Sequence, residues 1–383
     1  MPNSAFRHGH SPQTPRQTSS KNQQALEIIM QRIYLLDFIR VITVVLVLIF
    51  HLNIHLNLTT SITLIDNFIS QGATSMTLFF MLSGFLYYYC YSDKLKFEYN
   101  TIKEFYKSRF IKIYVLYFLC MSIYMIIYAP NFKIFLRMLP MQIIPLQAFF
   151  PSTFNTLWNG GLWFVSDILF LYLCFPIFLY ILKFTKINLY ILFAFVYLLI
   201  NYSVIIDLYY PSVPAFLYVS PFFRCLEFFA GMIAAKISNQ INIKYFSSLK
   251  IIICICFYIL IVGLLKDKAY LHNVRFYSSY LNFDLFLVPL FGILLFICSK
   301  TTGGFLLKIS KSRVCLYLSK ISYAFYLSQI FVLLPLKNSG LKFDNNFQLF
   351  CTALITNTIL SIILFEITKY LFQLLKLHKR KIL

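Results

Sequence analysis

The sequence predicts an all-α protein, a polytopic transmembrane helical bundle of about ten spans with both termini in the cytoplasm. Of its 383 residues, 60% are hydrophobic and only 12% are charged. A soluble globular domain carries roughly 45–50% apolar and about 25% charged residues, so this composition excludes a water-soluble fold. The hydrophobic residues also fall in long runs, and most lysines and arginines lie between those runs. These observations together predict an integral, multi-pass membrane protein.

Three segments are expected along the chain. Residues 1–31 are polar and lack the apolar core of a signal peptide, which predicts a disordered cytoplasmic tail. Residues 32–376 carry the apolar runs, and residues 377–383 form a short basic cytoplasmic tail. A bilayer core of about 30 Å is crossed by roughly 20 helical residues. The runs of that length are 33–56, 72–91, 108–129, 162–182, 187–207, 215–236, 249–265, 281–299, 314–336 and 347–375.

The basic residues predict the orientation of these spans. With ten spans, the segments on the same side as the two termini hold most of the 34 lysines and arginines. Cytoplasmic segments are the ones enriched in these residues, so both termini are predicted to be cytoplasmic. The net charge of +21 therefore comes from basic residues that we interpret as setting the topology and contacting anionic membrane lipids. Nucleic acid is not an expected partner.

The first predicted span places an arginine and a histidine on one face of a helix. Arg40 and His51 are eleven residues apart, which is nearly three helical turns and about 16 Å of rise. Charged groups in a membrane usually face a protein interior or a water-filled cavity, which makes this pair a candidate catalytic site. Asp37 precedes Arg40 by three residues and can orient its guanidinium. The alternative for His51 is a packed histidine that only bonds a neighbour.

Two further motifs lie in the second and third spans. Ser83 and Gly84, flanked by aromatic residues, predict either close helix packing or a groove for a ligand. Arg109 and Lys112 open the predicted third span and suit phosphate binding, and Arg40 on the same side of the membrane could complete that site. The alternative is that both are interfacial cations whose charged ends reach the membrane surface.

Six motifs follow one another along the predicted membrane region. They are the Arg40–His51 spacing, Phe79–Phe85, the Arg109–Lys112 pair, Gly161–Asp167 with Tyr172 and Pro176, Arg224–Met232, and Ile321–Gln329. Together they resemble the acyltransferase-3 family, which comprises integral membrane acyltransferases that modify bacterial surface carbohydrates and related acceptors. The resemblance covers roughly residues 32–336 and implies a multi-pass protein of the bacterial inner membrane.

Three residues depart from the pattern of that family. Lys112 stands where the family more often has arginine, and lysine keeps the charge but loses the bidentate fork. Asp167 stands where glutamate is common, which shortens the side chain by one methylene. Gln329 occupies a position that is often histidine. We therefore expect no proton transfer at Gln329, and His51 becomes the expected catalytic base.

The resemblance implies an acyl-CoA donor, and we expect acetyl-CoA. Arg40, Arg109 and Lys112 would hold the coenzyme A phosphates, and Ser83 would contact the same cofactor. The pantetheine arm would run along the first helix to His51, the expected general base on an acceptor hydroxyl, a role that contributes typically about 10²–10⁴-fold. A transient acyl-histidine remains an alternative to direct transfer.

The expected acceptor is a carbohydrate or glycolipid bound from the non-cytoplasmic side. Trp163, Asp167 and Glu227 are the candidate contacts, because an aromatic ring beside a carboxylate suits a sugar; a membrane-interface role is the alternative for Trp163. Arg224 and Glu227 are expected to form an intramembrane ion pair, with direct ligand contact as the alternative. Asp284 lies near the end of a span and is expected to be solvated.

The predicted function is an O-acyltransferase acting on a sugar hydroxyl of a cell-surface polysaccharide or its lipid-linked precursor. No metal is expected, because only His51 and His55 have ligand-like spacing and no HExxH-type carboxylate accompanies them. The competing function is a transporter or flippase of lipid-linked glycans, with Arg40, His51 and Glu227 along its path. The sequence lacks matched half-repeats with broken helices, which are common in transporters, and this favours the enzyme.

Overall fold

The computed structural model describes most of the predicted membrane region. The described residues are 32–128, 133, 136, 139, 140, 143–150, 160–209, 214–243, 247–266 and 280–381 without 281, 342 and 344. The predicted tail 1–31 lies outside them. The helices described below all belong to one compact unit, Tyr34–Leu383.

The regular secondary-structure elements of the described part of the chain are all helices, which confirms the all-α fold class. Three of them are short 3-10 helices: η1 (Gly72–Thr74), η2 (Gln147–Phe149) and η4 (Gly160–Leu162). The α-helices are α2 (Tyr34–Leu56), α3 (Thr63–Ser70), α4 (Ser75–Tyr91), α5 (Tyr99–Tyr128), α7 (Trp163–Phe184), α8 (Leu189–Tyr209), α9 (Pro214–Val219), α10 (Pro221–Gln240), α11 (Ser248–Leu265), α14 (Asp284–Lys300), α15 (Phe305–Ser310), α16 (Arg313–Asn338) and α17 (Asn346–Lys381).

Six helices of the described chain are long and apolar enough to cross a membrane: α2, α5, α7, α11, α16 and α17. Helices α3 and α4 form a seventh candidate if they are one broken span, since they meet at a bend of 53°. Helices also occupy the other predicted spans, but α14 has only 17 residues and α10 carries Arg224, Glu227 and Lys236. The structure therefore agrees with a helical membrane bundle, while the count of ten spans and the cytoplasmic termini stay predictions.

Two helices extend beyond the predicted boundaries. Helix α5 begins at Tyr99 and not at 108, so Arg109 and Lys112 lie several turns inside it and do not open it. Helix α17 runs to Lys381 and takes in 377–381 of the predicted tail. Hydropathy marks the part of a helix that lies in lipid, whereas a helix can continue into water wherever its residues favour that conformation.

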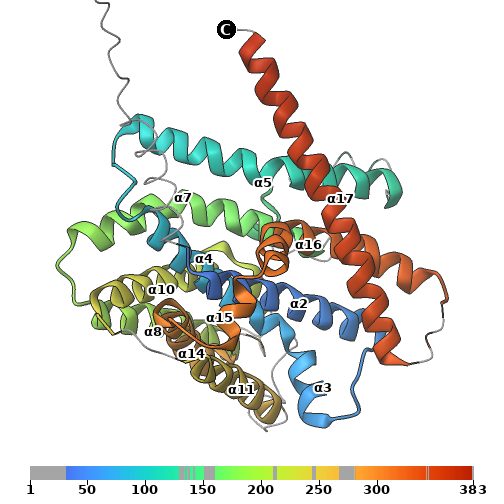
Figure 1. The fold of residues 1–383 in the computed structure, drawn as a ribbon, viewed down its shortest axis with the longest axis horizontal. Helices are drawn as coiled ribbons and strands as arrows, with labels where there is room; N and C mark the ends of the chain where they lie inside the picture. The colour runs from blue at the N-terminus through green and yellow to red at the C-terminus, as the bar shows by residue number, and fades with distance from the viewer. Residues whose placement is uncertain are drawn as a thin grey trace, which may run out of the picture. The chain divides into compact units, whose positions relative to one another are not determined.

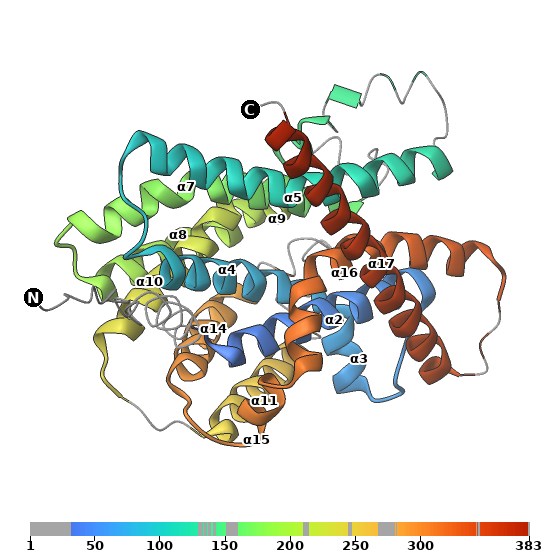
Figure 2. The ribbon, with the colours of Figure 1, turned by 45° about the horizontal axis from the view of Figure 1, so that its top comes forward.

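The packing of the bundle places α16 in contact with both α2 and α17, and Figures 1 and 2 show these three helices together. Their interface is a hydrophobic cluster that includes Val44, Leu48, Val332 and Ala353. The two views also show α5 running alongside α7, with which it is in contact. Helix α16 is thus held between α17 and the helix that carries Arg40 and His51.

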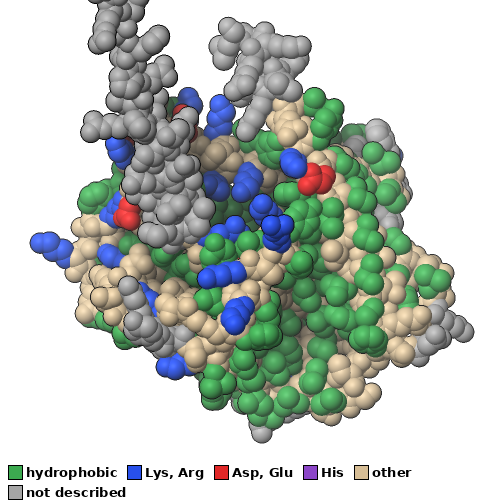
Figure 3. Space-filling view, viewed as in Figure 1, with side chains coloured by type: hydrophobic (Ala, Val, Ile, Leu, Met, Phe, Trp, Pro, Cys, Tyr) green, Lys and Arg blue, Asp and Glu red, His purple; other side chains and the backbone are tan. Residues whose placement is uncertain are grey.

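Outward-facing helical surfaces are hydrophobic. On α8 the exposed side chains of Ile191, Phe195, Leu198 and Tyr202 recur at helical spacing, with exposed fractions of 55–67%. Figure 3 shows Lys and Arg side chains gathered on one side of one face of the molecule, whereas hydrophobic side chains cover most of the rest of it. Such a separation of apolar and cationic surface is expected of a protein that sits in a bilayer.

Candidate active site

Helix α2 directs Arg40 and His51 toward the same neighbouring helix. Arg40 Nη1 donates a hydrogen bond to Ser319 Oγ at 3.3 Å, and His51 Nδ1 lies 2.7 Å from Gln329 Oε1. Both partners belong to α16, and their order shows that α2 and α16 run side by side in the same direction. The prediction that Arg40 and His51 share one face of a helix is confirmed.

The hydrogen bond of His51 identifies which ring nitrogen is available for chemistry. A carboxamide oxygen can only accept, so Nδ1 of a neutral imidazole must carry the hydrogen and Nε2 keeps the lone pair. The other end of the Gln329 amide, Nε2, donates to the backbone oxygen of Val44 at 3.4 Å, which is consistent with this orientation of the amide. Among the described residues, no hydrogen-bond partner contacts Nε2 of His51. That nitrogen is therefore free to accept a proton.

Arg40 belongs to a small polar network at the other end of α2. Its Nη1 lies 3.4 Å from Asp37 Oδ1, and Ser319 Oγ donates a hydrogen bond to the same carboxylate oxygen at 2.7 Å. The Asp37 side chain is 12% exposed and that of Arg40 is 29% exposed. Asp37 therefore orients Arg40 as expected, and the guanidinium keeps enough exposure to meet a ligand.

Arg109 lies on α5 among aromatic side chains. Its guanidinium carbon is 5.5 Å from the ring centre of Tyr87, 5.0 Å from that of Tyr91 and 5.9 Å from that of Phe105. A guanidinium is attracted by the faces of such rings at this distance, so the rings hold the charge in place. The ring of Tyr87 also lies against that of Tyr172, with ring centroids 4.8 Å apart.

The three predicted phosphate-binding residues come together in space. The ammonium of Lys112 lies within electrostatic reach of the guanidinium groups of Arg109 and Arg40. Lys112 is exposed, and Arg109 is partly exposed. We call Arg40, Arg109 and Lys112 the cationic cluster. Its like charges repel one another, an arrangement that an anionic ligand would relieve.

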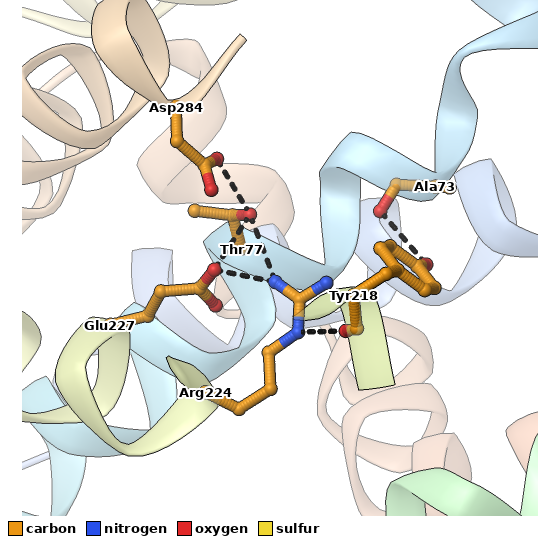
Figure 4. Close-up of polar contacts among 6 residues, drawn as sticks. All are labelled: Ala73, Thr77, Tyr218, Arg224, Glu227 and Asp284. Atoms are coloured by element: carbon orange, nitrogen blue, oxygen red, sulfur yellow. Dashed lines mark hydrogen bonds and ion pairs between the residues drawn. The ribbon is translucent and has the colours of Figure 1, made fainter. Parts of the chain in front are cut away.

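A second polar group is enclosed by α4, α10 and α14 (Figure 4). Arg224 Nη1 pairs with Glu227 Oε1 at 2.5 Å, and Arg224 Nε donates to the backbone oxygen of Tyr218 at 2.7 Å. Thr77 Oγ1 is 2.9 Å from Asp284 Oδ1 and 3.3 Å from Glu227 Oε1. Arg224 and Glu227 are each 1% exposed and Asp284 is fully buried. The predicted ion pair is confirmed, and the prediction that Asp284 is solvated is wrong, because its helix begins inside the bundle.

Aromatic rings surround the buried guanidinium. The guanidinium carbon of Arg224 lies 4.6 Å from the ring centre of Tyr218, 5.4 Å from that of Phe80 and 5.9 Å from that of Trp163. Trp163 is only 6% exposed, so its ring packs inside the bundle and does not face outward. Asp167, one turn further along α7, is fully buried and interacts electrostatically with Arg224. Neither of its carboxylate oxygens has a hydrogen-bond partner among the described residues.

Gly84 and Ser83 fit different alternatives: Gly84 fits close helix packing, and Ser83 stays available to a ligand. Gly84 is a packing contact, because a Cβ built on it would lie 1.8 Å from the backbone oxygen of Phe228 on α10. Ser83 is partly exposed, and its hydroxyl donates to Phe79 O within α4. Ser83 stands one turn before Tyr87 on the same face of α4. Because the ring of Tyr87 contacts Arg109, this face points toward the cationic cluster.

Sequence reasoning missed the partners that α16 supplies. Gln329 stood out only as a departure from a family motif, and Ser319 gave no signal at all. Both contacts join residues far apart in the chain, since 278 positions separate His51 from Gln329. Spacing along one helix predicts which side chains share a face, but it does not predict which other helix that face meets.

Comparison with known proteins gives one match. A family model described as an acyltransferase domain matches residues 33–366. No curated protein and no solved structure matches the chain.

Proposed function

The chain belongs to the acyltransferase-3 family, and from this premise we propose that it is an O-acyltransferase of the bacterial inner membrane. Family membership and the apolar helices make it an integral membrane acyltransferase. We propose acetyl-CoA as the donor and a sugar hydroxyl of a cell-surface polysaccharide, or of its lipid-linked precursor, as the acceptor. Membership of an acyltransferase family favours this function over a transporter or flippase of lipid-linked glycans.

The cationic cluster supports the proposed donor site. Coenzyme A carries phosphate groups, and guanidinium and ammonium groups are the side chains that bind phosphate best. Arg109 and Arg40 would supply planar, directional hydrogen bonds, whereas Lys112 would supply a point charge. Ser83, on the face of α4 that leads to this cluster, would contact the same cofactor.

The shared face of α2 is the observation that carries the proposed mechanism. Arg40 and His51 both face α16, about 16 Å apart along the helix, a distance that an extended pantetheine arm can span. Nε2 of His51 would remove the proton of the acceptor hydroxyl while that oxygen bonds to the thioester carbonyl carbon. The carbon–sulfur bond then breaks, and the proton passes from His51 to the thiolate of coenzyme A. Direct transfer needs no residue other than His51 as base.

The acceptor site is proposed around Asp167, Trp163 and Glu227. Asp167 offers two carboxylate oxygens that have no hydrogen-bond partner among the described residues. Sugar hydroxyls are donors that would satisfy such oxygens, and the indole ring of Trp163 lies close by on the same helix. Glu227 has one further oxygen, Oε2, without a partner among the described residues.

The proposal is tested with purified protein in detergent, acetyl-CoA labelled in the acetyl group, and a panel of glycans. Coenzyme A binding is measured separately by isothermal titration, so that donor binding and transfer are distinguished. The proposal expects saturable coenzyme A binding and label appearing on a glycan as an ester. Wild-type protein that binds no coenzyme A would exclude the proposed donor.

A further inference from the structure

We propose that Gln329 is a positioning residue for the acyl transfer: its side-chain oxygen holds His51 in the tautomer with hydrogen on Nδ1 and leaves Nε2 as the base. The inference rests on the proposed function, in which His51 takes the proton of the acceptor hydroxyl. Gln329 itself touches no reacting atom in this account and acts only through the imidazole.

The geometry around Gln329 fixes both ends of its amide. Oε1 accepts from His51 Nδ1 at 2.7 Å, and Nε2 faces the backbone oxygen of Val44 at 3.4 Å. A rotation of the amide by 180° would place an NH2 group against Nδ1 and an oxygen against a carbonyl oxygen, which loses the second contact and creates a repulsion. Gln329 is 2% exposed, so water does not compete for either contact.

A neutral partner distinguishes this site from one that uses a carboxylate. Asp or Glu beside Nδ1 would both fix the tautomer and stabilise an imidazolium. Gln329 does the first but, being neutral, stabilises the imidazolium less than a carboxylate would, so His51 is oriented with less bias toward its protonated form. Close to the ring of His51 stand Phe50, with a centroid distance of 5.5 Å, and His55, with 6.1 Å. Neither of them supplies a negative charge.

The test is the tautomer of His51 in the full-length protein, measured by nitrogen-15 NMR with ring-labelled histidine in detergent. The His51 signal is assigned by its loss in His51→Asn. Wild type should show hydrogen on Nδ1. Gln329→Leu should shift His51 to the other tautomer or to a mixture. It should also lower kcat by about 10–100-fold, the loss seen when a metal-bound histidine loses its orienting hydrogen-bond partner, with an unchanged KM for acetyl-CoA.

Gln329→Glu serves as the conservative variant, because a glutamate oxygen still accepts from Nδ1. It should keep the Nδ1 hydrogen, and the acid limb of its pH–rate profile should move to higher pH, since the carboxylate stabilises the imidazolium. A merely structural residue would shift neither the tautomer nor the profile.

Asn357→Leu is the matched control. Asn357 is also a fully buried amide bonded to α16, through Ser328 Oγ at 2.8 Å and Phe325 O at 3.0 Å. It should lower stability without changing the His51 tautomer. An unchanged tautomer and kcat in Gln329→Leu would overturn the inference. Because the NMR measurement needs no acceptor, it remains decisive for Gln329 even if the wild type transfers no acyl group and the proposed function fails.

Discussion

Gly84 of α4 and Gly231 of α10 lie where these two helices cross, and each is pressed against the backbone of the other helix. A Cβ on Gly84 would lie 1.8 Å from Phe228 O, and one on Gly231 would lie 2.0 Å from Met81 O. Small residues at a crossing let helix backbones approach closely in a membrane. This approach brings α4 near enough to α10 for Thr77 to reach the buried ion pair.

Gly84→Ala should destabilise the bundle, because the added methyl group overlaps a backbone oxygen that no side-chain rotation can move. Overpacking of this kind costs about 1–3 kcal/mol or more, and here the helices themselves must separate. Thermal unfolding in detergent, followed by tryptophan fluorescence, measures the loss. Gly292→Ala on α14 is the control, since its Cβ would meet only side-chain atoms of Phe193 and Met81, at 3.6 Å or beyond. Equal melting temperatures for the two variants would contradict the packing argument.

His51→Ala should abolish acetyl transfer while leaving coenzyme A binding nearly unchanged. The reason is that His51 lies about 16 Å along α2 from Arg40, the member of the cationic cluster on that helix. Loss of a general base lowers the rate by about 10²–10⁴-fold. His55→Ala is the companion variant: His55 lies one turn further along α2 and is exposed, so transfer should persist. Full transfer activity in His51→Ala would contradict the proposed role of His51 as the general base.

Arg109→Ala should weaken coenzyme A binding about tenfold or more, the equivalent of losing one charge-assisted hydrogen bond. Isothermal titration of the purified variant with coenzyme A gives the affinity directly. Lys107→Ala removes one positive charge from an exposed position of the same helix and controls for net charge. If both variants lose affinity equally, the loss comes from the overall positive charge of the protein and not from a phosphate-binding site at Arg109.

Arg224→Ala should destabilise the protein by about 3–5 kcal/mol, because it leaves Glu227 and Asp284 buried without their cation. The double variant Arg224→Leu with Glu227→Leu should be less destabilised than the single one, since it also removes Glu227, one of the two carboxylates left without a cation. Denaturation in detergent compares the two. Lys369→Ala, which breaks the exposed pair with Glu366, should change stability little. A double variant worse than the single one would show that the pair is not the source of the loss.

Sequence alone predicted the helical fold class and the shared face of Arg40 and His51, because hydropathy and helical periodicity act within one segment. The ion pair of Arg224 and Glu227 was predictable for the same reason. Asp284 was misjudged, since position near a span end does not reveal that Thr77 and Glu227 enclose it. Contacts between helices depend on how the bundle assembles: Gly84 indicated that its helix packs closely against another, but no local pattern identified α10 as that helix.

The ion pair of α10 has a consequence for how the chain enters a bilayer during synthesis. Arg224 and Glu227 stand three residues apart on one helix, so each charge meets its counter-ion as soon as that helix forms. These two charges therefore neutralise each other within one helix and need no helix that emerges later. Asp284 instead accepts its hydrogen bond from Thr77 of α4, so its carboxylate is bonded only after α14 packs against a helix made much earlier.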